Sequence, residues 1–187
     1  MNTIFSSFQT SFNYLISGSS FDHLLILILI GIIFQLKDLK KYFTLMLALI
    51  IGTGIGFLLN TLNIFNFSIY SIKLTMAISI LAVGIHNLLS TNTVINAIRY
   101  NFFAIIGIIM GIGLNNYYEK IYPSKLAFTT VLGFNLGILT AYLAITIISL
   151  LLSSLVLLIF KIEKKNYHIA MAGIGIGISL MLIFFRY

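Results

Sequence analysis

The sequence predicts an all-α, polytopic membrane helix bundle with about six transmembrane helices and an N-terminal amphipathic interfacial helix. Hydrophobic residues make up 60% of the 187-residue chain and charged residues only 8%, whereas a soluble domain carries about 25% charge. The mean hydropathy is +1.10. Several apolar runs approach the roughly 20 residues that a helix needs to cross the hydrocarbon core, and they lack the alternation of a membrane β-barrel. We therefore expect one integral membrane domain over residues 1–187.

The charged residues are distributed as topology signals. The formal net charge is +7 at pH 7, but the Lys and Arg residues stand in short clusters between apolar runs, as they do in the loops of membrane proteins. We therefore expect the lipid bilayer as a partner and no nucleic acid. The chain has no cysteine, which excludes disulfides, thiolate metal ligands and thiol catalysis.

Spans are predicted at residues 21–36, 42–62, 69–89, 98–114, 126–150 and 169–185, after the amphipathic helix at residues 3–16. Apolar side chains recur at helical spacing in that first helix, so we expect it to lie in the membrane interface. The apolar run at residues 126–160 would be about 52 Å long as one helix. It is therefore either one tilted helix or a span with an interfacial extension. Glycine repeats such as Gly52 and Gly56 predict close helix packing.

The basic residues also predict an orientation. They fall into a larger set on one side of the six spans (Lys37, Lys40, Lys41, Arg99, Lys161, Lys164 and Lys165) and a smaller set on the other (Lys73, Lys120, Lys125 and Arg186). The positive-inside rule places the larger set in the cytoplasm. We expect a bacterial inner (plasma) membrane protein with both termini on the outer, periplasmic side.

The most unusual polar residues are Asp22 and His23, which head the first apolar run. If Lys37 marks the cytoplasmic border, Asp22 lies about 22 Å above it along the helix. The same count from the basic residues that flank the second and fourth spans places Thr53 about 18 Å and Met110 about 16 Å up. These positions share a level in the outer leaflet, where an ionisable group should face the bundle interior or a water-filled vestibule.

Two interpretations of Asp22 and His23 stay open. In one, the carboxylate caps the first turn of its helix, offsets the helix dipole and pairs with Lys73. In the other, the two side chains are the remainder of a metal site or a proton path.

Other polar residues are expected to be structural. Asn135 stands in the fifth span and should bond to a neighbouring helix, with partners available at Asn115, Asn116 and Thr53. We expect His86 to be an interfacial or interhelical hydrogen-bonding group. His168 should lie in a solvated loop that faces anionic lipid.

Five motifs occur along the chain in order: Phe21-Asp22-His23-Leu24-Leu25; Phe43-Thr44 leading into Gly52-Thr53-Gly54; Ala77-Ile78-Ser79-Ile80 with Asn87-Leu88; Gly107-Ile108-Ile109-Met110-Gly111-Ile112-Gly113 with Asn115-Asn116-Tyr117; and Phe134-Asn135-Leu136-Gly137. In this order and spacing the chain resembles the HupE/UreJ family over roughly residues 5–145. The resemblance implies a small polytopic protein that moves nickel or cobalt, or assists hydrogenase and urease maturation. In that family, His and acidic side chains from several spans carry the metal chemistry.

Most of those implied ligands are replaced in this chain. Asp22 and His23 match the Asp-His pair of the family, whereas other positions that the family gives to His or Glu hold Tyr14, Thr53, Lys73, Met110 and Leu139. A nickel or cobalt site made of imidazole and carboxylate needs several converging ligands. An ammonium beside the path also disfavours a cation.

We therefore expect a HupE/UreJ-like protein without transport activity. It would act as a scaffold or accessory subunit of a larger membrane complex, with another membrane protein as its partner and no cofactor. The alternative is a nickel or cobalt permease, or a metallocentre-maturation accessory protein, that uses Asp22 and His23. An intramembrane enzyme ranks third, because the sequence has no Ser-His-Asp arrangement, paired-carboxylate site or zinc-protease helix.

Overall fold

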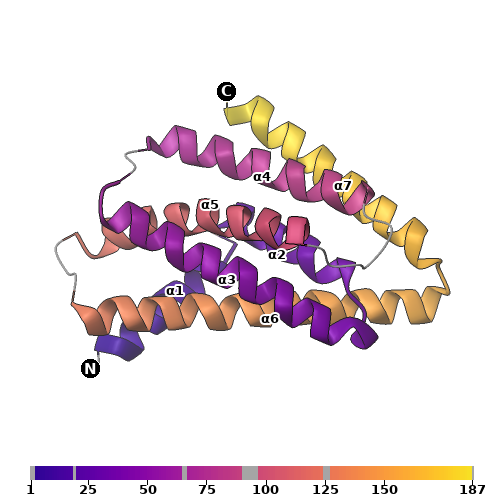
Figure 1. The fold of residues 1–187 in the computed structure, drawn as a ribbon, viewed down its shortest axis with the longest axis horizontal. Helices are drawn as coiled ribbons and strands as arrows, with labels where there is room; N and C mark the ends of the chain where they lie inside the picture. Colours follow the sequence, from indigo (N-terminus) through magenta and orange to yellow (C-terminus); the bar gives the residue numbers. More distant parts are fainter. Residues whose placement is uncertain (1–2, 19, 65–66, 90–96, 124–126, 187) are drawn as a thin grey trace.

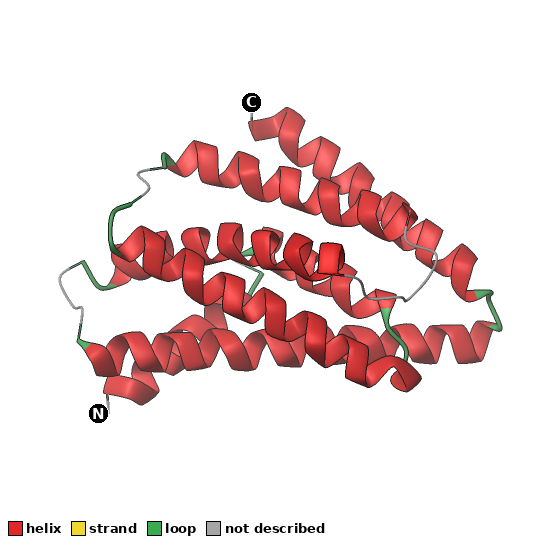
Figure 2. Ribbon diagram, in the orientation of Figure 1, coloured by secondary structure: helices red, strands yellow, loops and turns green. Residues whose placement is uncertain are grey.

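The computed structural model describes residues 3–18, 20–64, 67–89, 97–123 and 127–186. In these ranges the chain is helical, and the helices are joined by short connections (Figure 2). In chain order the elements are α1 (Thr3–Ile16), α2 (Phe21–Ile33), a 3-10 turn η1 (Leu36–Asp38), α3 (Leu39–Thr61), α4 (Ile69–Leu89), α5 (Ala97–Ile121), α6 (Phe128–Phe160) and α7 (Lys164–Arg186). The predicted all-α class is confirmed, and the bounds of α4 are those predicted for the third span.

Five of these helices are long and apolar enough to cross a membrane, namely α3 together with η1, α4, α5, α6 and α7. The predicted first span is shorter than expected, because the backbone is extended at Phe34 and Gln35 and α2 ends after 13 residues. At 1.5 Å per residue α2 is about 20 Å long, less than the thickness of the hydrocarbon core. A sixth crossing forms only if α1 and α2, bent by 74°, make one broken span.

The short helix α2 lies in the middle of the bundle, where it contacts α1, α4, α6 and α7. Nine of its 13 residues are buried, including His23. The first turn of α2, with Asp22 and His23, is therefore enclosed by neighbouring helices. This agrees with the expectation that an ionisable group at this depth faces the interior.

The predicted glycine faces join α3 to α5. A Cβ added to Gly56 would lie 2.7 Å from the carbonyl carbon and 2.8 Å from the Cα of Ile108, and one added to Gly52 would lie 2.9 Å from the carbonyl carbon of Ala104. Gly111 of α5 likewise approaches the backbone of α3 at Phe57. The two helices run side by side in the same direction (Figure 1), at a separation that only glycine allows.

The N-terminal helix α1 forms where the sequence predicts it, and it packs along the first half of α6. The face it buries is the one with Ser7 and Ser11, which lie against Gly133 and Gly137. The Ser11 hydroxyl donates to the carbonyl oxygen of Phe134 at 2.7 Å. Leu15 is fully buried on the same face and Phe12 packs against the core, whereas Phe5 is 59% exposed. Small residues thus bring α1 close to α6, as is usual inside membranes, and Leu15 and Phe12 add apolar contacts with the core.

The long apolar run forms one continuous helix, α6, of 33 residues. Of the two alternatives left by the sequence, this is the single helix, about 50 Å long. It runs along the bottom of the bundle in Figure 1, past the ends of its neighbours. Helix α6 continues far toward the end of the bundle that carries Lys37. Leu139 therefore lies well inside the bundle, level with Thr53 of α3, and both residues line one pocket.

Candidate functional site

A pocket of about 380 Å³ lies where α2 and α4 begin and α5 and α7 end. We call it the Asp22 pocket. Its polar and aromatic lining comes from five helices and from Ser20 before α2, and comprises Tyr14, Ser20, Phe21, Asp22, His23, Lys73, Asn116, Tyr117, Lys120 and Arg186. The structure therefore brings Asp22, His23 and Lys73 together, as the sequence predicted. It also adds Arg186, which sequence reasoning placed on the same side of the membrane but did not connect with Asp22.

Asp22 is held by Arg186. The guanidinium donates two hydrogen bonds to the carboxylate, from Nη1 to Oδ2 at 2.9 Å and from Nη2 to Oδ1 at 3.0 Å. Both side chains are largely buried, at 14% and 23% exposure. Nη1 also donates to the backbone carbonyl of Lys73 at 3.0 Å. The predicted pairing of Asp22 with the ammonium of Lys73 is therefore wrong. The charge partner of Asp22 is the guanidinium of Arg186, which binds the carboxylate in a bidentate manner, and Lys73 contacts Arg186 only through its backbone carbonyl oxygen.

His23 is buried, with 5% exposure, and its Nε2 lies 3.2 Å from the carbonyl oxygen of Met110. Because a carbonyl oxygen only accepts, Nε2 carries the proton and Nδ1 holds the lone pair of the neutral ring. A Cβ added to Gly113 would lie 3.4 Å from Cε1 of His23, an ordinary contact, so the ring packs beside this glycine. The contact confirms that the start of α2 and Met110 share a level.

Two tyrosines form part of the pocket wall. Tyr14 stacks on Tyr117 with ring centroids 3.5 Å apart and nearly parallel planes. The Ser20 hydroxyl donates to the Tyr14 carbonyl at 3.2 Å and does not cap α2. Asp22 lies in the first turn of α2, where its charge offsets the helix dipole. The expected compensation of the helix dipole by Asp22 is therefore present, although both carboxylate oxygens accept hydrogen bonds from Arg186.

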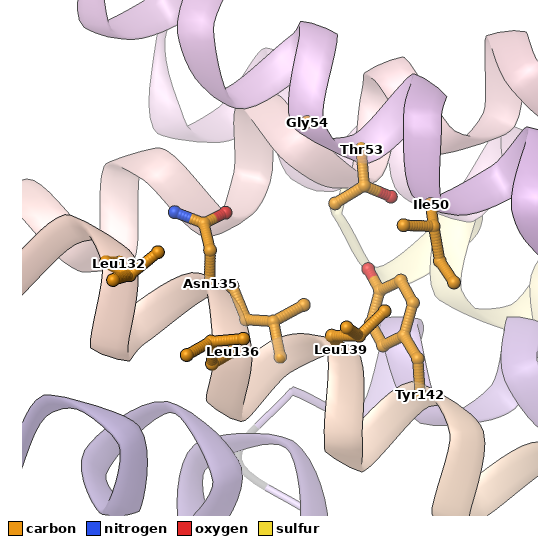
Figure 3. A pocket seen from close by; sticks show the side chains of 9 residues that line it. Ile50, Thr53, Gly54, Leu132, Asn135, Leu136, Leu139 and Tyr142 are labelled. Atoms are coloured by element: carbon orange, nitrogen blue, oxygen red, sulfur yellow. The ribbon is translucent and has the colours of Figure 1, made fainter. Parts of the chain in front are cut away.

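A second pocket, of about 200 Å³, lies between α3 and α6, and we call it the Tyr142 pocket. Figure 3 shows Thr53 projecting into it from α3, with Asn135 and Tyr142 projecting from α6. Leu139 completes the wall. Two positions that the family resemblance assigns to ligands, Thr53 and Leu139, therefore meet here. The Asp22 pocket has neither of them in its lining.

The structural polar residues bond differently from the prediction. The Asn135 amide donates to the carbonyl of Val131 in its own helix at 2.9 Å, so the predicted interhelical bond is wrong. Thr53 donates to the Leu49 carbonyl at 2.9 Å, also within its helix. Asn115 is fully buried and does join two helices, because the Thr61 hydroxyl of α3 donates to its Oδ1 at 2.8 Å.

The remaining histidines lie outside both pockets. Arg99 donates from Nε to Nε2 of His86 at 2.9 Å, which links α5 to α4 and confirms the predicted interhelical role. His168 lies within α7, half-buried, and not in a loop as predicted. Helix α7 begins at Lys164, five residues before the predicted span.

The described side chains around Asp22 and His23 do not form a donor set for a nickel or cobalt ion as cargo. Among the described residues no three His, Cys, Asp or Glu side chains gather closely enough to hold a metal ion. Asp22 gives both oxygens to a guanidinium and His23 gives one ring nitrogen to a carbonyl. Nδ1 of His23 is left, and one imidazole nitrogen does not fit the needs of a divalent N/O site.

The five long apolar helices among the described residues define a polytopic membrane protein. The family model described as HupE / UreJ protein matches residues 1–187. The chain belongs to the HupE/UreJ family, and the match extends beyond the 5–145 region of the sequence resemblance to its whole length. No curated protein and no solved structure matches the chain.

Proposed function

We propose that this HupE/UreJ family member is a non-transporting scaffold or accessory subunit of a larger membrane complex. The observation that supports the proposal is the two-point contact of Arg186 with Asp22. A carboxylate held in this way must first lose two charge-assisted hydrogen bonds, worth about 1.5–3 kcal/mol each, before it binds a divalent cation. In this proposal the Asp-His pair stabilises the bundle and carries no cargo.

The same proposal places the protein in a bacterial inner membrane, with both termini on the periplasmic side and another membrane protein as partner. The Asp22–Arg186 contact supports a common side for the two ends of the chain. Gly54, Gly173 and Gly177 support the partner, because a Cβ at each would meet nothing within 4 Å among the described residues. Helix surfaces with such glycines permit close approach of a further helix. No catalytic role and no cofactor form part of the proposal.

The alternative function is a nickel or cobalt permease, or a metallocentre-maturation accessory protein. It is favoured by one observation, that Asp22 and His23 line the same pocket at the end of the bundle. Transport through this site would require the guanidinium of Arg186 to swing away and an approaching cation to pass Lys73 and Lys120. Both requirements are electrostatically unfavourable.

One experiment separates the two functions. The protein is isolated in mild detergent by an affinity tag, and the same sample is analysed for co-purifying proteins and for nickel and cobalt. We expect a stoichiometric membrane partner and no bound metal. Saturable nickel or cobalt binding that is lost in both Asp22→Ala and His23→Ala would refute the scaffold and establish the permease. His168→Ala, far from the pocket along α7, is the matched control for loss of an imidazole.

A further inference from the structure

The Asp22 pocket carries an excess of positive charge. Lys73, Lys120 and Arg186 line it together with a single carboxylate, Asp22. Arg186 neutralises Asp22, whereas neither lysine ammonium forms an ion pair within the described part of the chain. The neighbouring acid, Glu119, accepts a hydrogen bond from Asn115 at 2.7 Å and does not line the pocket. Two lysines without an ion-pair partner among the described residues thus line one concave space.

The Asp22 pocket lies at the ends of several apolar helices, which determines the ligands that can enter it. Lys120 is one residue from the end of α5, Arg186 ends α7, and Ile69 begins α4. Basic residues at the ends of transmembrane helices lie at the level of lipid headgroups. The pocket is therefore accessible both to solutes in water and to the headgroups of one leaflet, and a group of either origin enters without crossing hydrocarbon.

We propose that the Asp22 pocket binds an anionic phosphate group through Lys73 and Lys120. Lysine ammonium groups bind phosphate as point charges, and charge-assisted hydrogen bonds of this kind are about twice as strong as neutral ones. The stacked rings of Tyr14 and Tyr117 supply a flat wall for the group that carries the phosphate. The volume, about 380 Å³, accommodates a phosphate with a substituent the size of glycerol. The inference goes beyond the scaffold role and stands without it.

The site also has an internal support. The guanidinium of Arg186 is fixed by Asp22 and by the Lys73 carbonyl, so it positions the backbone of Lys73 at the pocket rim. Arg186 is a positioning residue in this proposal, and the two lysines are the binding residues. Because Lys73 and Lys120 are both exposed, replacing either with Gln removes charge without leaving a cavity in the core.

The test measures thermal unfolding of the full-length protein in dodecyl maltoside during titration with sodium phosphate, against sodium chloride at equal ionic strength. A ligand that binds only the folded state raises the unfolding temperature as its concentration passes Kd. A second arm compares nanodiscs of phosphatidylglycerol with nanodiscs of phosphatidylcholine. A rise with phosphate identifies a free anion as ligand, and a rise with phosphatidylglycerol alone identifies a lipid headgroup.

With whichever ligand raises the unfolding temperature, Lys73→Gln and Lys120→Gln should each weaken apparent binding by about tenfold. Lys73→Arg should bind as the native protein does. Lys37→Gln and Lys161→Gln, at the other end of the bundle, should leave it unchanged. The proposal is overturned if neither arm raises the unfolding temperature. It is also overturned if the Lys73 and Lys120 variants respond like the two controls. Unfolding temperatures without ligand show whether each variant remains folded.

Discussion

The α3–α5 contact allows a sharp test of the packing, because α3 contains two glycines in opposite environments. A Cβ at Gly56 would lie 2.7 and 2.8 Å from backbone atoms of Ile108, whereas a Cβ at Gly54 would meet nothing within 4 Å. Both positions are helical, so Gly→Ala gains the same intrinsic propensity, about 1 kcal/mol. At Gly56 the carbonyl oxygen of Ile108 is closer still than its carbonyl carbon at 2.7 Å, so the helices must separate by more than about 0.7 Å to restore ordinary contact at 3.4 Å. Overpacking of this kind costs about 1–3 kcal/mol, and backbone atoms cannot rotate away.

We therefore expect Gly56→Ala to be less stable than Gly54→Ala by about 1–3 kcal/mol. Gly54→Ala itself should equal the native protein or exceed its stability by up to about 1 kcal/mol. The measurement is the free energy of unfolding from titration with sodium dodecyl sulfate in dodecyl maltoside micelles, followed by circular dichroism. Equal midpoints for the two alanine variants would show that α3 and α5 do not approach as closely as described.

Two further pairs of variants test the buried polar contacts by the same titration. Arg186→Gln leaves the carboxylate of Asp22 without its charge partner and should lower the free energy of unfolding by about 1–3 kcal/mol. Adding Asp22→Asn should recover most of that loss. A double variant no more stable than Arg186→Gln alone would contradict the pairing. Tyr142→Phe should be close to neutral, because the buried hydroxyl makes no hydrogen bond of ordinary geometry among the described residues and interacts only with Thr53 outside that geometry. Tyr42→Phe should cost about 1 kcal/mol, because its hydroxyl bonds to Thr146 at 2.6 Å; equal losses for the two tyrosines would contradict this assignment.

The bundle was predictable from sequence where one physical quantity dominated. Hydropathy alone located α4 at its observed bounds, and the helical rise placed the first turn of α2 level with Met110, which the contact of His23 with the Met110 carbonyl confirms. The glycine spacing of Gly52 and Gly56 predicted a close helix pair, and the structure supplies α5 as the partner. In each case the inference needed only local pattern and the length of a helix.

The partners of individual polar groups were not predictable in the same way. Asp22 pairs with a residue 164 positions away, and nothing in local spacing ranks Arg186 above Lys73. A usable signal was present, because Arg186 ends the last span on the predicted side of Asp22 and guanidinium fits carboxylate in a bidentate manner. The predicted partner of Asn135 was wrong for another reason. Its amide donates to the carbonyl of Val131 one turn earlier, and such a local bond competes with a bond to another helix.

The Asp22–Arg186 contact also imposes an order of assembly. Chains are made from the N-terminus at roughly 5–20 residues per second, so α7 follows α2 by roughly 8–33 s, given the 164 residues between the partners. During that interval the carboxylate of Asp22 has no guanidinium to meet and must remain hydrated or bound to something else. The ion pair therefore forms only when α7 reaches α2, after the helices between them have been made.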